Sequence, residues 1–454
     1  MLPLPVWRTA FQFDAFARGA ALGFVLPVVA TAWPVWRAVR VPPVAALTTT
    51  HRAAQGGLSV LLRRLRHPAG TFARMPIGNV LRTPRRTLLT ALGIAAAVTA
   101  LVSTMGMIDS FVATLERNDR EVLGTHPDRL AVALEGFQPI GGPDIATISR
   151  DPTVGAVQPV LRVGARLTAP GAAEPIDLIV DIIDLDGPVW GPTIVRGELP
   201  ADRGGLVISA EAAADLAIGP GDDVTMEHPA LRARGLEMAR TDVRVAAVHP
   251  SPFRFTTYLD RSQLGGLGLP DVANHLYVVP AHGATPSDVQ RALFDAPAVA
   301  STQPVGTASE VVNDSLDEFV GVLRVLEGFI VLLALLIAYN ATSIGVDERA
   351  REHATLFAFG LPLRTVVRMD VVENLLIGLL GTLLGVVAGL GVLGWFTQVL
   401  IAETMPEMGI DVAVAPATVI TAVVLGIVAI AAAPLLTVRR LRRMDIPDTL
   451  RVVE

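Results

Sequence analysis

Apolar residues gather in five long stretches of the chain, at about residues 17–36, 87–108, 322–343, 371–400 and 417–437. Each stretch is long enough to cross roughly 30 Å of hydrocarbon as an α-helix. Residues 109–321, between the second and third stretches, mix polar and apolar positions as a water-soluble domain does. The pattern predicts an integral membrane protein with five spans and one large domain outside the bilayer core.

The two ends of this large domain continue the helical period of the neighbouring spans. Apolar residues recur at helical spacing after the second span and before the third, at Ile108, Phe111, Val112 and Leu115 and at Leu316, Phe319, Val320 and Leu323. Such stripes bury each other when they meet. They predict two helices that leave the membrane together as a stalk.

Strand-like runs alternate with short helices between the two stalk helices. The runs lie at 129–134, 175–185, 205–209, 223–227, 242–248 and 275–280. The clearest helix is 210–217, with Ser209 as its N-cap and Gly219-Pro220-Gly221 as the turn that ends it. We therefore predict a mixed fold, an α-helical transmembrane bundle of about five spans with an α+β extracytoplasmic domain on a helical stalk.

The charges beside the spans predict which side of the membrane each segment faces. Segment 38–86 has no acidic residue and nine arginines, Arg40, Arg52, Arg63, Arg64, Arg66, Arg74, Arg82, Arg85 and Arg86. The positive-inside rule places it in the cytoplasm, together with the arginine-rich tail after the last span. Residues 110–320 contain 29 acidic residues and 15 arginines. We therefore expect a cell-membrane protein with an acidic extracytoplasmic domain and a cytoplasmic C-terminus.

Two residue types are absent from the composition. Without cysteine the chain forms no disulfide and no zinc–thiolate or iron–sulfur site. Without lysine it has neither the phosphate-binding lysine of a P-loop ATPase nor a Schiff-base amine. We predict that the chain itself binds no cofactor and that any ATP is used by a partner subunit.

The predicted outer domain contains no catalytic or metal-binding motif. The eight histidines are dispersed, and no Gly-x-Ser-x-Gly nucleophile elbow occurs. Asp177, Asp181, Asp184 and Asp186 fall on a predicted strand whose two-residue period spreads them over both faces, so we interpret them as surface charge. The domain is too acidic for a nucleic-acid partner. The chain is therefore not expected to be an enzyme.

The first span resembles a copy of the last one. Without gaps, an offset of 403 residues pairs Leu22 with Leu425, Gly23 with Gly426, Arg37 with Arg440, Arg40 with Arg443 and Leu47 with Leu450. Transporters are commonly built from such repeats. The repeat predicts that residues 1–50 end a first half and that 71–454 form a complete second half. A second permease half, or a second copy of this chain, is then an expected partner.

Residues 76–105, PIGNVLRTPRRTLLTALGIAAAVTALVSTM, resemble the opening of an FtsX-like permease of the MacB type, an ABC transporter component. A short interfacial helix and an Asn-x-x-Arg-x-Pro-Arg-Arg-Thr motif precede the span. We expect Arg82, Arg85 and Arg86 on this side, and Arg439, Arg440 and Arg443 after the last span, to lie at the membrane interface and bind lipid phosphates.

Segment 344–370 is similar to the cytoplasmic helix with which this family docks on its ATPase. The matching residues are Glu348, Arg349, Arg351, Glu352, Leu356, Phe357, Phe359 and Gly360. The charges suit a water-exposed face, the leucine and phenylalanines offer an apolar edge, and Gly360 can end the helix in a left-handed conformation. His353 replaces an aliphatic residue of the family, and Phe357 stands where arginine is frequent.

Two further segments resemble the same family. Arg443-Met-Asp-Ile-Pro-Asp-Thr-Leu450 is similar to its closing motif, with Ile446 in place of a proline. Gly205-Leu-Val-Ile-Ser209, followed by Ala217-Ile-Gly-Pro-Gly-Asp-Asp-Val224, resembles its periplasmic core domain. The resulting domains are an N-terminal remnant (1–50), a basic linker with an interfacial helix (51–86), a span with its stalk helix (87–120), the MacB-like core domain (121–307) and a stalk helix with a three-span FtsX-like domain (308–454).

The resemblance implies a permease subunit that couples ATP hydrolysis by a separate ABC ATPase to a conformational change outside the membrane. The expected cargo is a lipoprotein, a peptide or an amphiphile that is exported or extracted. One alternative is an FtsX-like signal transmitter that activates an extracytoplasmic hydrolase. Another is a membrane-anchored receptor or enzyme without an ATPase. Co-purification of an ATPase, or of a hydrolase, would discriminate between them.

Overall fold

The computed structural model describes residues 13–40, 78, 80 and 84–442, except 125, 173, 233, 234, 297 and 349. The chain divides into two compact units, residues 1–65 and residues 66–454. The first unit contains helix α1 (Phe13–Val39), whose described side chains are exposed and largely apolar. Its length and composition suit a membrane span.

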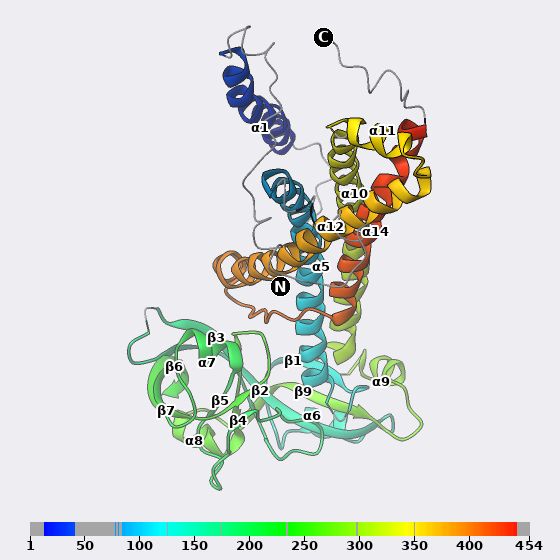
Figure 1. Ribbon diagram of the computed structural model, residues 1–454. Helices are drawn as coiled ribbons and strands as arrows, with labels where there is room; N and C mark the ends of the chain where they lie inside the picture. The colour runs from blue at the N-terminus through cyan, green and yellow to red at the C-terminus, as the bar shows by residue number, and fades with distance from the viewer. Residues whose placement is uncertain are drawn as a thin grey trace. The chain divides into compact units, whose positions relative to one another are not determined.

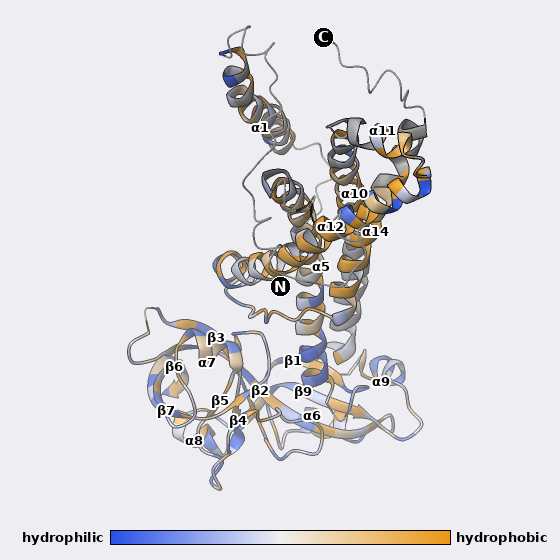
Figure 2. Ribbon diagram, in the orientation of Figure 1, coloured by the Kyte–Doolittle hydropathy of each residue, from blue (hydrophilic) through white to orange (hydrophobic). Residues whose placement is uncertain are grey.

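Four long helices form the membrane part of the second unit: α5 (Pro84–Leu123), α10 (Val305–Glu348), α12 (Leu363–Trp395) and α14 (Pro416–Arg442). With α1 they give five helices that are long and apolar enough to cross a bilayer, which confirms the fold class predicted for the membrane part. Figure 2 shows hydrophobic residues along α12 and α14 and a more hydrophilic end of α5 beside the sheet.

The stalk arises because α5 and α10 continue unbroken beyond their apolar spans. On α5, Leu115 is buried and Ile108, Phe111 and Val112 are half-buried, as a packed stalk helix requires. The matching stripe predicted on α10 lies at side chains outside the described residues. Figure 1 shows both helices running toward the strands.

Glycines on α12 allow it to pack closely against α5. A Cβ added at Gly381 would lie 2.7 Å from Ala91 O, and one at Gly385 would lie 2.6 Å from Val98 Cβ. Gly389 faces Val102 in the same way, so the three glycines are four residues apart along one face. Small residues at this spacing let membrane helices approach each other where water provides no hydrophobic force between them.

Residues 130–304, called here the β domain, contain the ten strands. Their bounds are β1 (Leu130–Pro139), β2 (Val154–Thr168), β3 (Ile176–Ile183), β4 (Arg196–Gly197), β5 (Leu206–Ser209), β6 (Asp223–Arg232), β7 (Gly235–His249), β8 (Thr256–Asp260), β9 (Val272–Pro280) and β10 (Val299–Pro304). The intervening short helices are α6 (Pro143–Ser149), α7 (Ala210–Asp215), α8 (Leu264–Leu267) and α9 (Pro286–Leu293).

Six of these strands close into a barrel. Strand β2 pairs with β3, and the pairing continues through β8, β5, β7 and β6 until β6 returns to β2. Both parallel and antiparallel pairs occur, which fits the predicted α+β class. Alternate side chains fill the interior, among them Leu167, Leu206 and Met226. Closure removes sheet edges that would otherwise invite pairing with other chains.

Strand β2 joins this barrel to a second sheet. Its residues 154–160 pair with β9, whereas 161–167 pair with β3. The second sheet continues from β9 through β1 to β10 and is covered by α6 and α9. All six predicted strands are present, but β2, β4, β8 and β10 were not predicted. Helix α7 has Ser209 as its N-cap, which accepts a bond from Ala212 N at 3.1 Å.

The aspartate series differs from its sequence interpretation in two respects, and the first is that Asp181 is buried, at 6% exposed, rather than a surface charge. Strand β3 ends at Ile183, so only Asp177 and Asp181 belong to it, and they share one face. Each forms an ion pair with an arginine of β2, Asp177 with Arg166 and Asp181 with Arg162, both at 2.7 Å. The prediction that the strand spreads the four aspartates over both faces was therefore wrong.

Candidate functional site

The segment predicted to couple to an ATPase forms helix α11 (Ala350–Ala358), between α10 and α12. It ends at Gly360, whose φ of +80° is left-handed and favours glycine. Gly360 N donates to Phe357 O at 2.9 Å and Leu361 N to Leu356 O at 3.1 Å. These two bonds form a Schellman motif, which stops the helix and reverses the chain into α12.

The apolar edge of α11 is partly accessible. Leu356 and Phe357 are half-buried, while Phe359 is 80% exposed. Ala354, one turn before Phe357, is fully buried. Arg349 and the side chains of Glu348, Arg351 and Glu352 lie outside the described residues, so their predicted roles remain predictions.

The predicted membrane-interface arginines occupy the ends of two helices. Arg85 and Arg86 belong to the first turn of α5, and Arg439 and Arg440 to the last turns of α14. The structure describes the backbone at these four positions but not their side chains. Arg82 and Arg443 lie outside the described residues, so lipid binding by this set stays a prediction.

The outer end of α5 is fixed to the β domain by a buried arginine that was not predicted. Arg129 is 2% exposed, and its Nη1 donates to Leu123 O at 2.7 Å and to His126 O at 3.1 Å. Its Nη2 donates to Val122 O. These carbonyls belong to the end of α5 or follow it, where helices leave acceptors unpaired and favour positive charge.

Two aromatic rings and a glutamate complete this attachment. The Arg129 guanidinium lies 5.3 Å from the Trp190 ring centre and 5.4 Å from that of Tyr277. Trp190 Nε1 donates to Glu121 O at 3.1 Å, and Thr193 N donates to Glu121 Oε1 at 2.8 Å. We call the set of Glu121, Arg129, Trp190, Thr193 and Tyr277 the α5 joint. The start of α10 is tied to it as well, because Val305 N donates to Arg129 O at 3.0 Å.

A second attachment was also not predicted. Two short helical segments, Phe396–Ile401 and α13 (Ala402–Thr404), follow α12. Residues 405–415, called here the outer loop, lead from them to α14 and contact the β domain on the way. Met408 forms an antiparallel bridge with Phe253 in the loop between β7 and β8. Arg254 N donates to Glu407 O at 2.9 Å, and Gly409 N donates to Pro252 O at 2.9 Å.

Side chains reinforce this bridge. Arg254 Nη2 lies 2.7 Å from Glu407 Oε1 on the outer loop, and its Nη1 lies 3.2 Å from Asp215 Oδ2 at the end of α7. We call Asp215, Arg254 and Glu407 the Arg254 clamp. The arginine side chain is 17% exposed, so water screens its two ion pairs only partly.

The other half of the outer loop is bonded to α5. Arg117 pairs with Asp411 at 2.5 Å, and Ser110 Oγ exchanges bonds with both Ala413 N and Ala413 O at 3.1 Å. Asp109 Oδ2 accepts from Ala415 N at 2.9 Å and from Thr418 Oγ1 at 2.6 Å, which caps the first turn of α14. One loop therefore connects α5, α12, α14 and the β domain.

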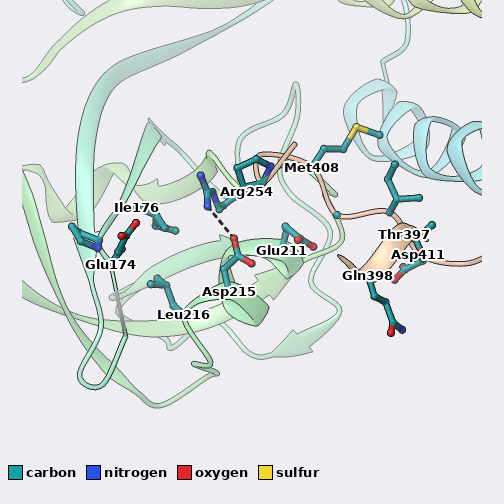
Figure 3. A pocket seen from close by; sticks show the side chains of 14 residues that line it. Glu174, Ile176, Glu211, Asp215, Leu216, Arg254, Thr397, Gln398, Met408 and Asp411 are labelled. Atoms are coloured by element: carbon teal, nitrogen blue, oxygen red, sulfur yellow. Dashed lines mark hydrogen bonds and ion pairs between the residues drawn. The ribbon is translucent and has the colours of Figure 1, made fainter. Parts of the chain in front are cut away.

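A cavity of about 560 Å³ lies where the outer loop meets the β domain. Figure 3 shows the residues that line it, among them Glu211, Asp215 and Arg254 from the β domain and Met408 and Asp411 from the outer loop. Burial, together with the negative charges of Asp215 and Asp411, raises the pKa of Glu211. The cavity is therefore acidic, and Arg254 is the basic residue among those that line it.

Comparison with known protein families shows which family the chain belongs to. The FtsX-like permease C-terminal family matches residues 325–446, and the MacB-like periplasmic core domain matches residues 87–296. The chain belongs to the FtsX-like permeases with a MacB-like periplasmic core domain. This family is that of ABC transporter permeases, which work with an ATPase partner and are not themselves enzymes. The β domain is accordingly the extracytoplasmic part of this permease.

Solved structures of extracytoplasmic regions match this permease at low identity. The periplasmic region of MacB from Actinobacillus actinomycetemcomitans is 13% identical, with a TM-score of 0.29, and the match covers 43% of this chain and 95% of that one. The extracellular domain of the noncanonic ABC-type transporter YknZ from Gram-positive bacteria is 15% identical, with a TM-score of 0.26 and coverages of 36% and 93%.

A domain of a putative permease from Porphyromonas gingivalis is also 15% identical, with a TM-score of 0.25 and coverages of 37% and 83%. No curated protein sequence matches the chain.

The outer attachments were missed for different reasons. The turn residues Pro406 and Gly409 signal a loop, but no sequence pattern names its contacts. Arg129 and Arg254 are single arginines among many in the chain.

The contact between α12 and α5 was also not predicted, although it has a signal in the sequence. The glycines at 381, 385 and 389 recur every four residues, and this spacing predicts a close helix contact.

Proposed function

We propose that this permease is the membrane subunit that couples ATP hydrolysis by a separate ABC ATPase to a conformational change of the extracytoplasmic β domain. The ATPase holds the nucleotide, and this chain needs no cofactor of its own. The change would serve export or extraction of a lipoprotein, a peptide or an amphiphile. Two permease halves are expected, from a second copy or a separately encoded partner.

The observation that carries the proposal is the continuity of α10. Its 44 residues run from Val305, beside the α5 joint, to Glu348, beside α11. A helix of that length spans about 66 Å, enough to cross the bilayer and reach well beyond it. Because a single helix joins the two ends, displacement of α11 would reach the β domain without passing through a flexible linker.

The features of α11 support an ATPase contact at the cytoplasmic end. Phe359 exposes an apolar ring, and the helix ends in a fixed reversal at Gly360, so the exposed edge is held in one orientation. Charged residues at 348–352 precede this edge. The orientation requires the C-terminus in the cytoplasm, where Arg439 and Arg440 would meet lipid phosphates.

Affinity purification from native membranes tests the proposal. The wild-type chain is compared with Glu348→Arg/Glu352→Arg, and co-purifying proteins and ATP hydrolysis are measured. We expect a P-loop ATPase with the wild type and a loss of about tenfold or more with the double variant, because reversal turns attraction between the surfaces into repulsion.

A matched control is Glu135→Arg/Glu237→Arg, which reverses two exposed glutamates of the β domain. It should retain the ATPase. Absence of any ATPase from the wild-type preparation would refute the proposal. A co-purifying extracytoplasmic hydrolase would instead favour the signal-transmitter alternative.

A further inference from the structure

The outer loop, which is bonded to α5 at Asp109, Ser110 and Arg117, provides a second connection between the membrane helices and the β domain in addition to the α5 joint. The stalk enters the domain at the α5 joint, beside β1 and β10. The outer loop reaches it at Pro252–Arg254, between the barrel strands β7 and β8. The two connections therefore enter the domain at different strands.

The backbone contact is a true strand-like pairing. The bonds Arg254 N to Glu407 O and Gly409 N to Pro252 O flank the Phe253–Met408 pair, which is the non-hydrogen-bonded arrangement of antiparallel strands. Met408 is 7% exposed. Gly409 lies so close to Glu211 that a Cβ at this position would overlap the carboxylate. The outer loop therefore packs directly against the barrel.

Two arginines balance the carboxylates at this contact: Arg117 of α5 pairs with Asp411, and Arg254 of the β domain pairs with Asp215 and Glu407. Glu407 and Asp411 on the loop face Glu211 and Asp215 on the barrel side, so carboxylates meet carboxylates across the contact. Arg254 bridges Asp215 and Glu407 and supplies the opposite charge between them. Without Arg254, the repulsion between Asp215 and Glu407 would act on a contact that two backbone bonds and the buried Met408 hold.

We propose that the outer loop is a second force-transmitting connection and that Arg254 is the positioning residue that holds it. Movement of the outer ends of α12 and α14 then reaches the barrel at β7 and β8 without passing through the α5 joint. The inference rests on the proposed function, since it concerns how ATP-driven movement is delivered. It assigns this delivery to the contact between the outer loop and residues 252–254.

Hydrogen–deuterium exchange on the complete permease–ATPase complex tests this assignment. Uptake in peptides covering 206–260 is compared between the nucleotide-free complex and the complex trapped with ATP and vanadate. In Arg254→Met we expect the nucleotide-dependent difference to fall about fivefold or more, the lower range of coupling between two sites. Arg261→Met is the matched control, because its side chain is 21% exposed and pairs with Asp271 away from the loop. It should keep the wild-type difference.

A disulfide can replace the missing clamp. The chain has no cysteine, so Phe253→Cys/Met408→Cys introduces one defined pair. Non-hydrogen-bonded partners have Cα atoms about 4.5 Å apart, which a disulfide can bridge. Oxidation of Arg254→Met/Phe253→Cys/Met408→Cys should restore the nucleotide-dependent difference, and reduction should remove it again. Each single cysteine variant should be insensitive to the oxidant.

The outcomes separate the two proposals. If Arg254→Met keeps the wild-type nucleotide-dependent difference in uptake, the role of the clamp is wrong. The same holds if the disulfide forms but does not restore that difference. Neither result contradicts the permease function. A wild-type complex that contains the ATPase but shows no nucleotide-dependent difference overturns the proposed function itself. If the nucleotide-dependent difference returns only when the disulfide is oxidised, the result supports both the permease function and the role of the clamp.

Discussion

The α5 joint and the Arg254 clamp both attach the β domain to the membrane helices through an arginine, yet the two arginines are bonded differently. Arg129 is 2% exposed and donates to backbone carbonyls three to seven residues away. Arg254 has a 17% exposed side chain and binds carboxylates 39 and 153 residues away. The first forms within one stretch of chain, whereas the second requires the membrane helices and the domain to have met.

This difference indicates different roles. Removing the buried Arg129 leaves three half-buried carbonyls at or just after the end of α5 without their donors, a cost that makes the α5 joint part of the fold. Removing Arg254 leaves carboxylates that water can still reach, so the clamp can be lost while the domain persists. The joint is thus a permanent attachment and the clamp a separable one.

The largest effect is expected from Arg129→Met. The change removes three hydrogen bonds and the charge between Trp190 and Tyr277, so we expect a loss of about 4 kcal/mol in unfolding free energy. Thermal unfolding of the purified full chain, followed by tryptophan fluorescence, measures it. Arg254→Met, measured alongside, should lose clearly less. Equal losses would contradict the distinction between the two attachments.

A smaller, pH-dependent effect is expected from His249, which ends β7 next to the clamp. The side chain is fully buried, and its Nε2 lies 3.1 Å from Thr256 O. Burial lowers the pKa of His249 to about 4 from 6.5. The folded side chain stays neutral while the unfolded one binds a proton. Stability is therefore complete above pH 6.5 and is lost as the pH falls toward 4, by about 3 kcal/mol.

Unfolding of wild type and His249→Phe between pH 7 and 4 measures this contribution. The variant should be less sensitive to acid, although some sensitivity should remain because burial also lowers the pKa of His275. His282→Phe, at an exposed turn, serves as control and should follow the wild type. An unchanged pH dependence in His249→Phe would rule out a neutral buried histidine beside the clamp.

The smallest of the three effects concerns the contact between α5 and α12. Helix α5 carries the α5 joint, and α12 leads toward the outer loop, so this contact connects the two attachments. Gly385→Leu places atoms where Val98 and Ala95 already lie, so we expect a loss of about 2 kcal/mol. Unfolding in increasing sodium dodecyl sulfate measures it. Gly391→Leu is the control, because a Cβ there meets nothing within 4 Å. Similar losses in both variants would show that the glycine contact does not hold α5 to α12.

The sequence alone supports much of this description where the signal is local. Hydropathy located the spans, because each must bury about 20 apolar residues in lipid whatever its neighbours are. Ser209 predicted the start of α7, because an N-cap is set by bonds within one turn. The motifs at 76–105 and 348–360 pointed to the permease family, which the family matches confirm.

Other features depended on the tertiary structure because their partners are far apart in the chain. Strand β2 was missed although it is 15 residues long, and its role in two sheets follows from pairing with β3, β6 and β9. The clamp joins Asp215, Arg254 and Glu407, and no local pattern marks residues that meet only after the chain has folded. Local chemistry therefore determined the elements and the family, whereas long-range packing decided how the membrane helices hold the extracytoplasmic domain.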